Sequence, residues 1–221
     1  MSLHKECADH LRANYRHLTG KKLSAGHAHE LVAAFFGYGT GAALRSETKY
    51  PLAAIEEAAI LIPDLRLMDR RIQEIENLPG DLPPTDDLAS RLCDFLVEEG
   101  YFTGEIWRTR DLAEHVSSRV RDNPSAIMDD LAGEMATTNA YFDGPDIDEI
   151  AIDVGEDALV ATLSGTLDGE QDQDRAFHGD KIVFATTMTL ERVAGRIAFF
   201  EPELDTGGGV DDSDYYDEEL A

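Results

Sequence analysis

Cysteine and long apolar runs are both scarce in this sequence. Among 221 residues only Cys7 and Cys93 occur, and two thiols in a chain of this length are typical of small core residues in a reducing compartment. The longest apolar runs, 31–36 and 58–62, are far shorter than the ~20 residues that cross a bilayer, so we expect no membrane partner. The opening residues mix charged with apolar side chains, which is unlike a signal peptide. We therefore predict a cytoplasmic protein.

Basic side chains are scarce as well. The chain has 19 Lys and Arg against 45 Asp and Glu, a net charge of −26. Residues 1–50 are the exception, because they hold seven basic and four acidic side chains. Nucleic-acid binding needs cations against phosphates, so any contact with DNA is expected only through residues 1–50. The acidic remainder fits a basic partner protein, although an acidic surface can also serve solubility alone. We interpret the excess of Arg over Lys, 14 to 5, as a sign of a bacterial GC-rich genome.

The front of the chain has the apolar spacing of helices. Leu3, Cys7, Leu11, Tyr15 and Leu18 recur every three or four residues and predict a first helix that ends at Gly20. A second helix is expected from Ser24, an N-cap residue, to Gly37, and Thr40 is suited to cap a short third one. Similar stripes continue to about Asn139, which predicts six to seven helices in all.

Beyond residue 140 the apolar period changes from about 3.6 to 2. This alternation predicts four strands, at 150–154, 159–164, 182–190 and 196–200. Short turns between neighbours favour an antiparallel β-meander with one face on the helices and the other in water. After Pro202 come three glycines and a run of acids, which predict a disordered tail. The predicted fold class is therefore α+β, with a helix-turn-helix-like module at 1–50, a helical region at 51–140, a β-sheet region at 141–204 and an acidic tail at 205–221.

Residues 24–45 resemble a known family. Their landmarks are His29-Glu30-Leu31, Ala34, Gly37-Tyr38 and Ala43-Leu44. The segment is similar to the short helical module called glyoxalase-related, which is found at the front of various bacterial and plasmid proteins. The family name implies a metal-dependent lyase. The module is an appendage, however, and the sequence lacks the paired strand-helix-strand repeats of a glyoxalase domain, so we do not carry the activity over.

One interpretation of the same segment is a DNA-binding helix-turn-helix motif. In a helix-turn-helix the second helix presents polar or basic side chains to base edges, and only Arg45 here is suited to guanine. The candidate nucleic-acid contacts are Lys21, Lys22, Thr40 and Arg45. The other interpretation is a helical pair that packs or binds protein.

Two groups of side chains have the chemistry of metal ligands. The first is His4, Cys7, His10, His27 and His29, which zinc would accept but whose spacing drifts around a helix. The second is Asp168, Glu170, Asp172 and Asp174, which begin like a calcium loop. That loop has Gln173 where glycine belongs and Gly179 where a bidentate Glu belongs. We therefore expect no cofactor.

Motifs of common enzymes are missing from the sequence. It contains no GxxxxGK[ST], HExxH or GxSxG pattern. The preferred hypothesis is a non-enzymatic interaction or regulatory protein that engages a basic partner through its acidic surface and tail. The candidate tail contacts are Asp211, Asp212, Asp214, Tyr215, Tyr216 and Asp217. A DNA-binding regulator that uses residues 24–45 is the alternative, and an undetected enzyme is the third.

Overall fold

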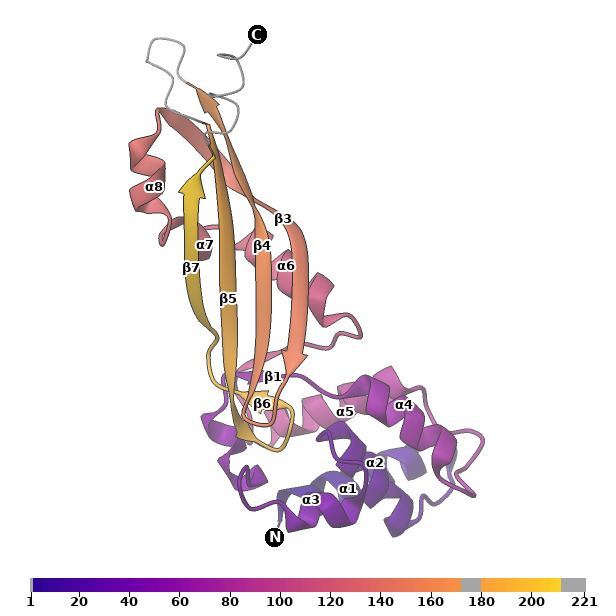
Figure 1. Ribbon diagram of the computed structural model, residues 1–221. Helices are drawn as coiled ribbons and strands as arrows, with labels where there is room; N and C mark the ends of the chain where they lie inside the picture. The colour runs from indigo at the N-terminus through magenta and orange to yellow at the C-terminus, as the bar shows by residue number, and fades with distance from the viewer. Residues whose placement is uncertain (1, 172–179, 212–221) are drawn as a thin grey trace. The chain divides into compact units, whose positions relative to one another are not determined.

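The computed structural model describes residues 2–171 and 180–211 of the chain (Figure 1). The fold is α+β, as the sequence predicts. The chain forms two compact units. Unit 1 consists of Met1–Arg110 and Glu191–Glu201, and unit 2 consists of Asp111–Leu190 and Pro202–Ala221.

Unit 1 is mainly helical. Its elements are α1 (Leu3–Thr19), α2 (Ala25–Phe35), α3 (Gly41–Ser46), η1 (Leu52–Glu57), β1 (Ile60–Leu61), α4 (Leu65–Glu74), α5 (Thr85–Glu98), β2 (Glu105–Ile106) and β6 (Ala198–Phe199). The last residues of β5 (Lys181–Ala194) also belong to it.

The predicted capping residues determine where the first helices begin and end. Gly20 follows α1 with a φ of 73°, a left-handed conformation that glycine adopts at little cost. The side chain of Ser24 accepts a hydrogen bond from the backbone N–H of His27, and that of Thr40 accepts one from Ala43. Each cap satisfies a donor that the first turn of a helix would otherwise leave unpaired.

Helix α2 lies at the centre of the core of unit 1. Six of its eleven residues are buried, including Leu31, Val32 and Phe35, and it packs against α1, α3 and α4. Helices α1 and α5 each bury only one face, as amphipathic surface helices do. Both cysteines are buried core residues, as predicted.

Unit 1 contains three short strands, of which β1 and β2 were not predicted from the sequence. Strand β1 pairs in parallel with β2 and antiparallel with β6, and β6 also pairs with the end of β5. Strands β1 and β2 have two residues each, too few to produce a visible alternation, and both lie in the segment 51–140 that was predicted to be helical. The predicted strand at 196–200 is reduced to Ala198–Phe199.

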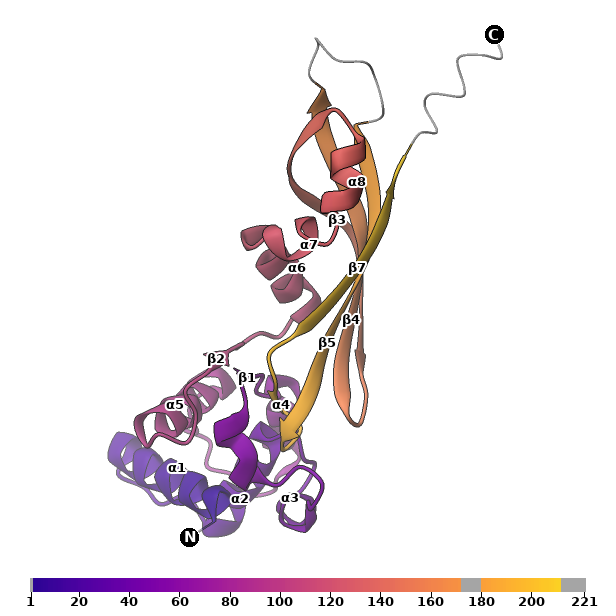
Figure 2. The ribbon, with the colours of Figure 1, turned by 90° about the vertical axis from the view of Figure 1, so that its left-hand side faces the viewer.

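Unit 2 consists of a sheet and three helices. Its elements are α6 (Leu112–Asp122), α7 (Ser125–Met128), α8 (Ala132–Thr137), β3 (Ala140–Val154), β4 (Ala158–Gln171), the main part of β5 and β7 (Glu203–Val210). Figure 2 shows the three helices along one face of this sheet. Helices α6 and α7 pack on β3, and α7 and α8 pack on β7.

The prediction of a four-stranded antiparallel meander is wrong. The described residues form a mixed seven-stranded sheet in the order β2-β1-β6-β5-β4-β3, with β7 also paired to β5. Strand β7 lies where a disordered tail was predicted from residue 205 onward. Eight register pairs join it to β5, from Thr189 with Glu203 to Ile182 with Val210. Hydrogen bonding to a long neighbour thus orders a glycine-rich segment of low β-propensity.

The inner face of the sheet in unit 2 forms its core. On β5 buried residues alternate with exposed ones, so Phe184 and Met188 face the helices. Gly208 on β7 faces the same way, because it pairs with Phe184. A Cβ atom at Gly208 would lie 2.8 Å from Leu131 Cδ2, so glycine here lets the buried Leu131 approach the sheet.

An ion-pair cluster joins α4, α5 and the segment after β2. Arg110 bonds to Asp69 and lies 2.7 Å from Asp86, and Thr85 donates a hydrogen bond of 2.5 Å to Asp69. The hydrogen bond from Thr85, followed by the bond and charge of Arg110, lowers the pKa of Asp69 below its ordinary value of 3.8. The ionised form is therefore stabilised in the folded state.

We expect Asp69→Asn to destabilise unit 1 in a pH-dependent manner. A carboxylate with a lowered pKa stabilises the fold above its unfolded pKa and loses that contribution as pH falls through its folded pKa. The substitution should lower the free energy of unfolding at pH 7 by about 1 kcal/mol or less, since the pair is partly exposed. The deficit should shrink as pH falls below 3.8. Urea unfolding followed by fluorescence of Trp107, the only tryptophan, measures the free energy of unfolding.

Asp87→Asn is the control and should show little deficit at pH 7 or below pH 3.8. A deficit for Asp69→Asn that does not vary with pH would contradict the mechanism.

Candidate functional site

The described elements of unit 2 leave the sheet face opposite its helices uncovered (Figure 2). In Figure 2 α6, α7 and α8 all lie on one side of β3, β4, β5 and β7. The exposed residues of β5 alternate with its buried ones, and the strand register extends this alternation to the neighbouring strands. We call the uncovered side the outer face.

Small and hydroxyl side chains occupy the middle of the outer face. They come from the two central strands: Val160, Thr162, Ser164 and Thr166 on β4, and Val183, Ala185, Thr187 and Thr189 on β5. Val183 is 47% exposed. This part of the face has short side chains that leave room for those of another molecule. The sheet thus has one face on the helices and one exposed face (Figure 2), as predicted.

Carboxylates surround this polar centre. By register the outer face carries seven acids: Asp146, Glu149 and Asp153 on β3, Asp168 and Glu170 on β4, and Glu203 and Asp205 on β7. The same alternation gives its described residues one cation, Lys181 at the start of β5. Charged edge strands oppose pairing with other sheets, so the acids of β3 and β7 also protect the two edges.

Two irregularities in β3 decide which of its acids reach the outer face. The register shifts between Phe142 and Pro145 and again between Ile147 and Glu149. Asp146 pairs with Thr166 and Glu149 with Ser164, so both lie on the outer face although they are three residues apart. In a regular strand this odd spacing would place them on opposite faces.

Charge is divided unequally between the two units. Unit 1 contains 15 basic and 19 acidic side chains, which gives −4, whereas unit 2 contains 4 basic and 26 acidic ones, which gives −22. Unit 2 therefore carries most of the net charge of −26. Such an accumulation destabilises a compact unit through self-repulsion and attracts cationic molecules from solution.

The four predicted nucleic-acid contacts lie in different settings. Lys21 pairs with Asp81 at 2.6 Å, and the hydroxyl of Thr40 caps α3. Arg45 lines a pocket of about 500 Å³ together with His4 and Tyr101, whereas Lys22 lines a second pocket beside Arg12 and Arg16. The structure thus brings Lys22 together with Arg12 and Arg16, which were not among the predicted contacts, and places Lys22 and Arg45 in different pockets.

The histidine and cysteine candidates do not assemble into a metal site among the described residues. The rings of His4 and His29 lie 5.8 Å apart, and burial, followed by the charges of His29 and Arg45, lowers the pKa of His4. Burial raises the pKa of the Cys7 thiol to about 12. A thiol of this kind is a poor metal ligand and a poor nucleophile near neutral pH, because both roles need the thiolate.

The acidic candidates are only partly described. Asp168 and Glu170 lie on the outer face, and Asp211 directly follows β7, where its backbone N–H donates to the carbonyl of Lys181. The remaining candidates lie outside the described residues: Asp172, Asp174, Asp212, Asp214, Tyr215, Tyr216 and Asp217.

Comparison with family models, curated proteins and solved structures finds no match for this chain. The resemblance of residues 24–45 to a glyoxalase-related module therefore stays a prediction. Within the described ranges, no helix combines the length and apolar character needed to cross a bilayer.

Proposed function

We propose that the protein binds a basic partner protein through the outer face of unit 2. The observation that carries this proposal is the arrangement of seven carboxylates against one lysine around a centre of small side chains. The acids Asp211 and Asp212 and the further acids of the tail continue the sequence from the end of β7, and we assign them to the same interaction.

The shape of the outer face suits long basic side chains. Lys and Arg have aliphatic stems that pack on apolar surface while their charged ends reach further. Val183 and Ala185 offer such surface at the centre, and Glu203 and Asp205 on the adjacent strand offer carboxylates. A partner that presents Lys and Arg from one face would therefore gain both kinds of contact. Charge complementarity of this type chiefly raises the association rate and excludes acidic competitors.

A role in solubility alone makes a different prediction. If the charge acts only through its total, removing carboxylates anywhere on unit 2 would weaken the attraction to a cation equally. If the outer face is a binding surface, the position of the removed carboxylates matters. Two variants of the full chain that lose the same charge at different positions separate the two cases.

We expect neutralisation of the outer face to abolish most binding of a basic probe. The triple variant Glu149→Gln, Asp153→Asn, Asp205→Asn should weaken binding of a lysine- and arginine-rich peptide about tenfold, because three partly exposed ionic contacts together supply about 1.4 kcal/mol. Fluorescence anisotropy of the labelled peptide at about 0.15 M salt, where distant charges are screened, measures the dissociation constant.

The matched control removes three acids from the helix side of unit 2. Asp129→Asn, Asp130→Asn, Glu134→Gln changes the net charge by the same amount at residues around the start of α8, and it should weaken peptide binding by less than about twofold. Equal weakening by the two triple variants would assign the charge to solubility. Absence of any binding to the unmodified chain at this salt concentration would refute the proposal outright.

The DNA-binding alternative has less geometric support. A recognition helix has to present several side chains to one groove of DNA. Here Lys21 forms an ion pair with Asp81, and the side chain of Thr40 caps α3. Helix α3 also has only six residues. We therefore prefer a protein partner.

A further inference from the structure

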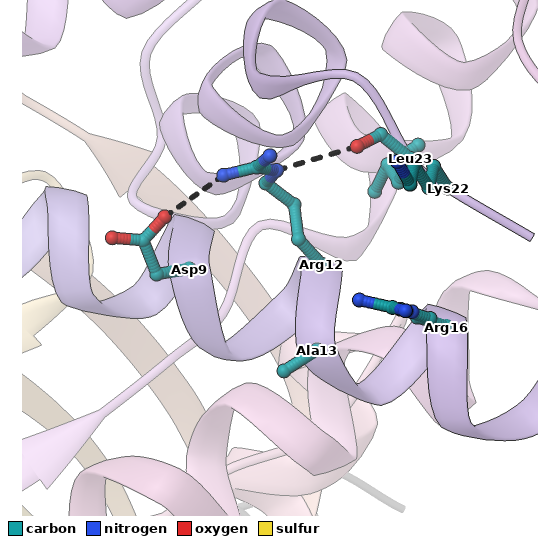
Figure 3. A pocket seen from close by; sticks show the side chains of 6 residues that line it. All are labelled: Asp9, Arg12, Ala13, Arg16, Lys22 and Leu23. Atoms are coloured by element: carbon teal, nitrogen blue, oxygen red, sulfur yellow. Dashed lines mark hydrogen bonds and ion pairs between the residues drawn. The ribbon is translucent and has the colours of Figure 1, made fainter.

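A basic pocket lies in unit 1 beside the second half of α1. Its volume is about 350 Å³, and it is lined by Asp9, Arg12, Ala13, Arg16, Lys22 and Leu23. The first four come from α1, and the last two come from the loop that leads to α2 (Figure 3). The lining has three cations and one carboxylate, in a chain whose net charge is −26.

Arg12 is held in place from two sides. Its Nη1 atom donates to Asp9 Oδ1 at 3.1 Å, and its Nε atom donates to the carbonyl oxygen of Leu23 at 3.3 Å. Figure 3 shows the guanidinium group between these two acceptors. Since a guanidinium has five N–H donors, three remain for a ligand, and their direction is fixed before any ligand arrives.

Arg16 and Lys22 complete the charge of the pocket. In the part of the chain that the structure describes, neither side chain forms an ion pair or a side-chain hydrogen bond, and both residues are exposed. Arg12 and Arg16 are four residues apart on α1, a spacing at which like charges repel. The helix dipole favours Arg16 near the C-terminus of α1, but it gives no reason for Lys22 to face the same hollow. An anion bound there would relieve the repulsion among all three.

We propose that this pocket binds a compact phosphate-bearing anion. The planar donors of Arg match the oxygens of a phosphate, Lys22 adds a third charge, and Leu23 and Ala13 supply an apolar wall for the group that the phosphate carries. The volume lies at the lower end of the range for small-ligand sites, about 300–1,000 Å³, which fits a ligand with one or two phosphates.

The acidity of the remaining surface selects a short anion over a polymer. At physiological salt a charge acts over about 8 Å, so an anion that fits inside the pocket interacts mainly with its three cations. A nucleic acid would extend beyond this range over the rest of unit 1, in which 19 acidic side chains outnumber 15 basic ones. A free small molecule and a nucleic-acid backbone are the two sources of such a phosphate. Comparing the binding of a short anion with that of a longer oligonucleotide distinguishes them.

Calorimetric titration of the full chain tests the proposal with defined probes. Pyrophosphate should bind with a dissociation constant below about 1 mM, a modest affinity for a small ligand, and inorganic phosphate should bind more weakly. The variant Arg16→Gln, Lys22→Gln should raise the dissociation constant for pyrophosphate about tenfold or more. Both substituted residues are exposed, so the fold should persist, and the fluorescence of the buried Trp107 checks this.

The matched control is Lys5→Gln, Arg70→Gln. It also removes one Lys and one Arg from exposed positions on helices of unit 1, and it should change pyrophosphate binding by less than about twofold. Equal losses in the two variants would overturn the proposal, as would no heat of binding at pyrophosphate concentrations of about 10 mM. A single-stranded oligonucleotide that binds more tightly than pyrophosphate at the same salt would refute the preference for a compact ligand.

Discussion

Replacing Phe35 with alanine should lower the free energy of unfolding by about 4 kcal/mol, the range for a large core residue truncated to alanine. Phe35 has no exposed surface and stands edge-on to Phe36, with ring centroids 5.1 Å apart. It ends α2, the most buried helix of unit 1, so the cavity would open where several helices meet. Helix α2 packs against α1, α3 and α4, so these helices would have to shift to fill the cavity. Urea unfolding followed by Trp107 fluorescence should show the transition at a lower denaturant concentration.

Leu18→Ala provides the control for this experiment. The side chain of Leu18 was assigned to the apolar stripe of the first helix, but it is 47% exposed and lies one residue before the end of α1. Truncation there should cost less than about 1 kcal/mol. A cost for Phe35→Ala no greater than that for Leu18→Ala would show that the assigned core of unit 1 is incorrect.

The helices of unit 1 could be predicted from the sequence because the features that define them are local. An N-cap such as Ser24, a left-handed glycine such as Gly20 and an apolar stripe all act within a few residues of each other. Strand β7 depends instead on pairing with residues of β5 about 20 positions earlier. A local signal was still present, because Leu204, Thr206 and Val210 alternate with more polar residues, but the three glycines concealed it.

The two binding surfaces differ in how far the sequence could indicate them. The basic character of residues 1–50 was visible, and Lys22 was selected from it. Arg12 and Arg16 share a pocket with Lys22 because the chain turns back toward α1 after Gly20. Composition does not reveal this turn. The acidity of the remainder was equally visible. Its gathering on one face depends on strand register, which two bulges in β3 change.

The second large effect is expected at Gly165, in the middle of β4. A Cβ atom there would lie 2.0 Å from the carbonyl oxygen of Asp146 and 3.0 Å from Phe184 Cζ. The first contact is with backbone and cannot be relieved by rotating a side chain. Gly165→Ala should therefore lower the free energy of unfolding by about 3 kcal/mol, the upper part of the range for overpacking. Urea unfolding followed by far-ultraviolet circular dichroism, to which the strands and helices of both units contribute, measures the change.

Gly207→Ala is the matched control for Gly165→Ala, because it places the same methyl group on the same sheet. No heavy atom lies within 4 Å of the Cβ position at Gly207, so the change should leave stability within about 1 kcal/mol or raise it, since alanine restricts the unfolded chain. Equal effects at the two glycines would contradict the close approach of β3 to β4.

Gly165 pairs with Ile147, at the edge of the bulge that brings Glu149 to the same face as Asp146. The absence of a side chain at Gly165 thus allows the irregular register on which the acidic arrangement of the outer face depends.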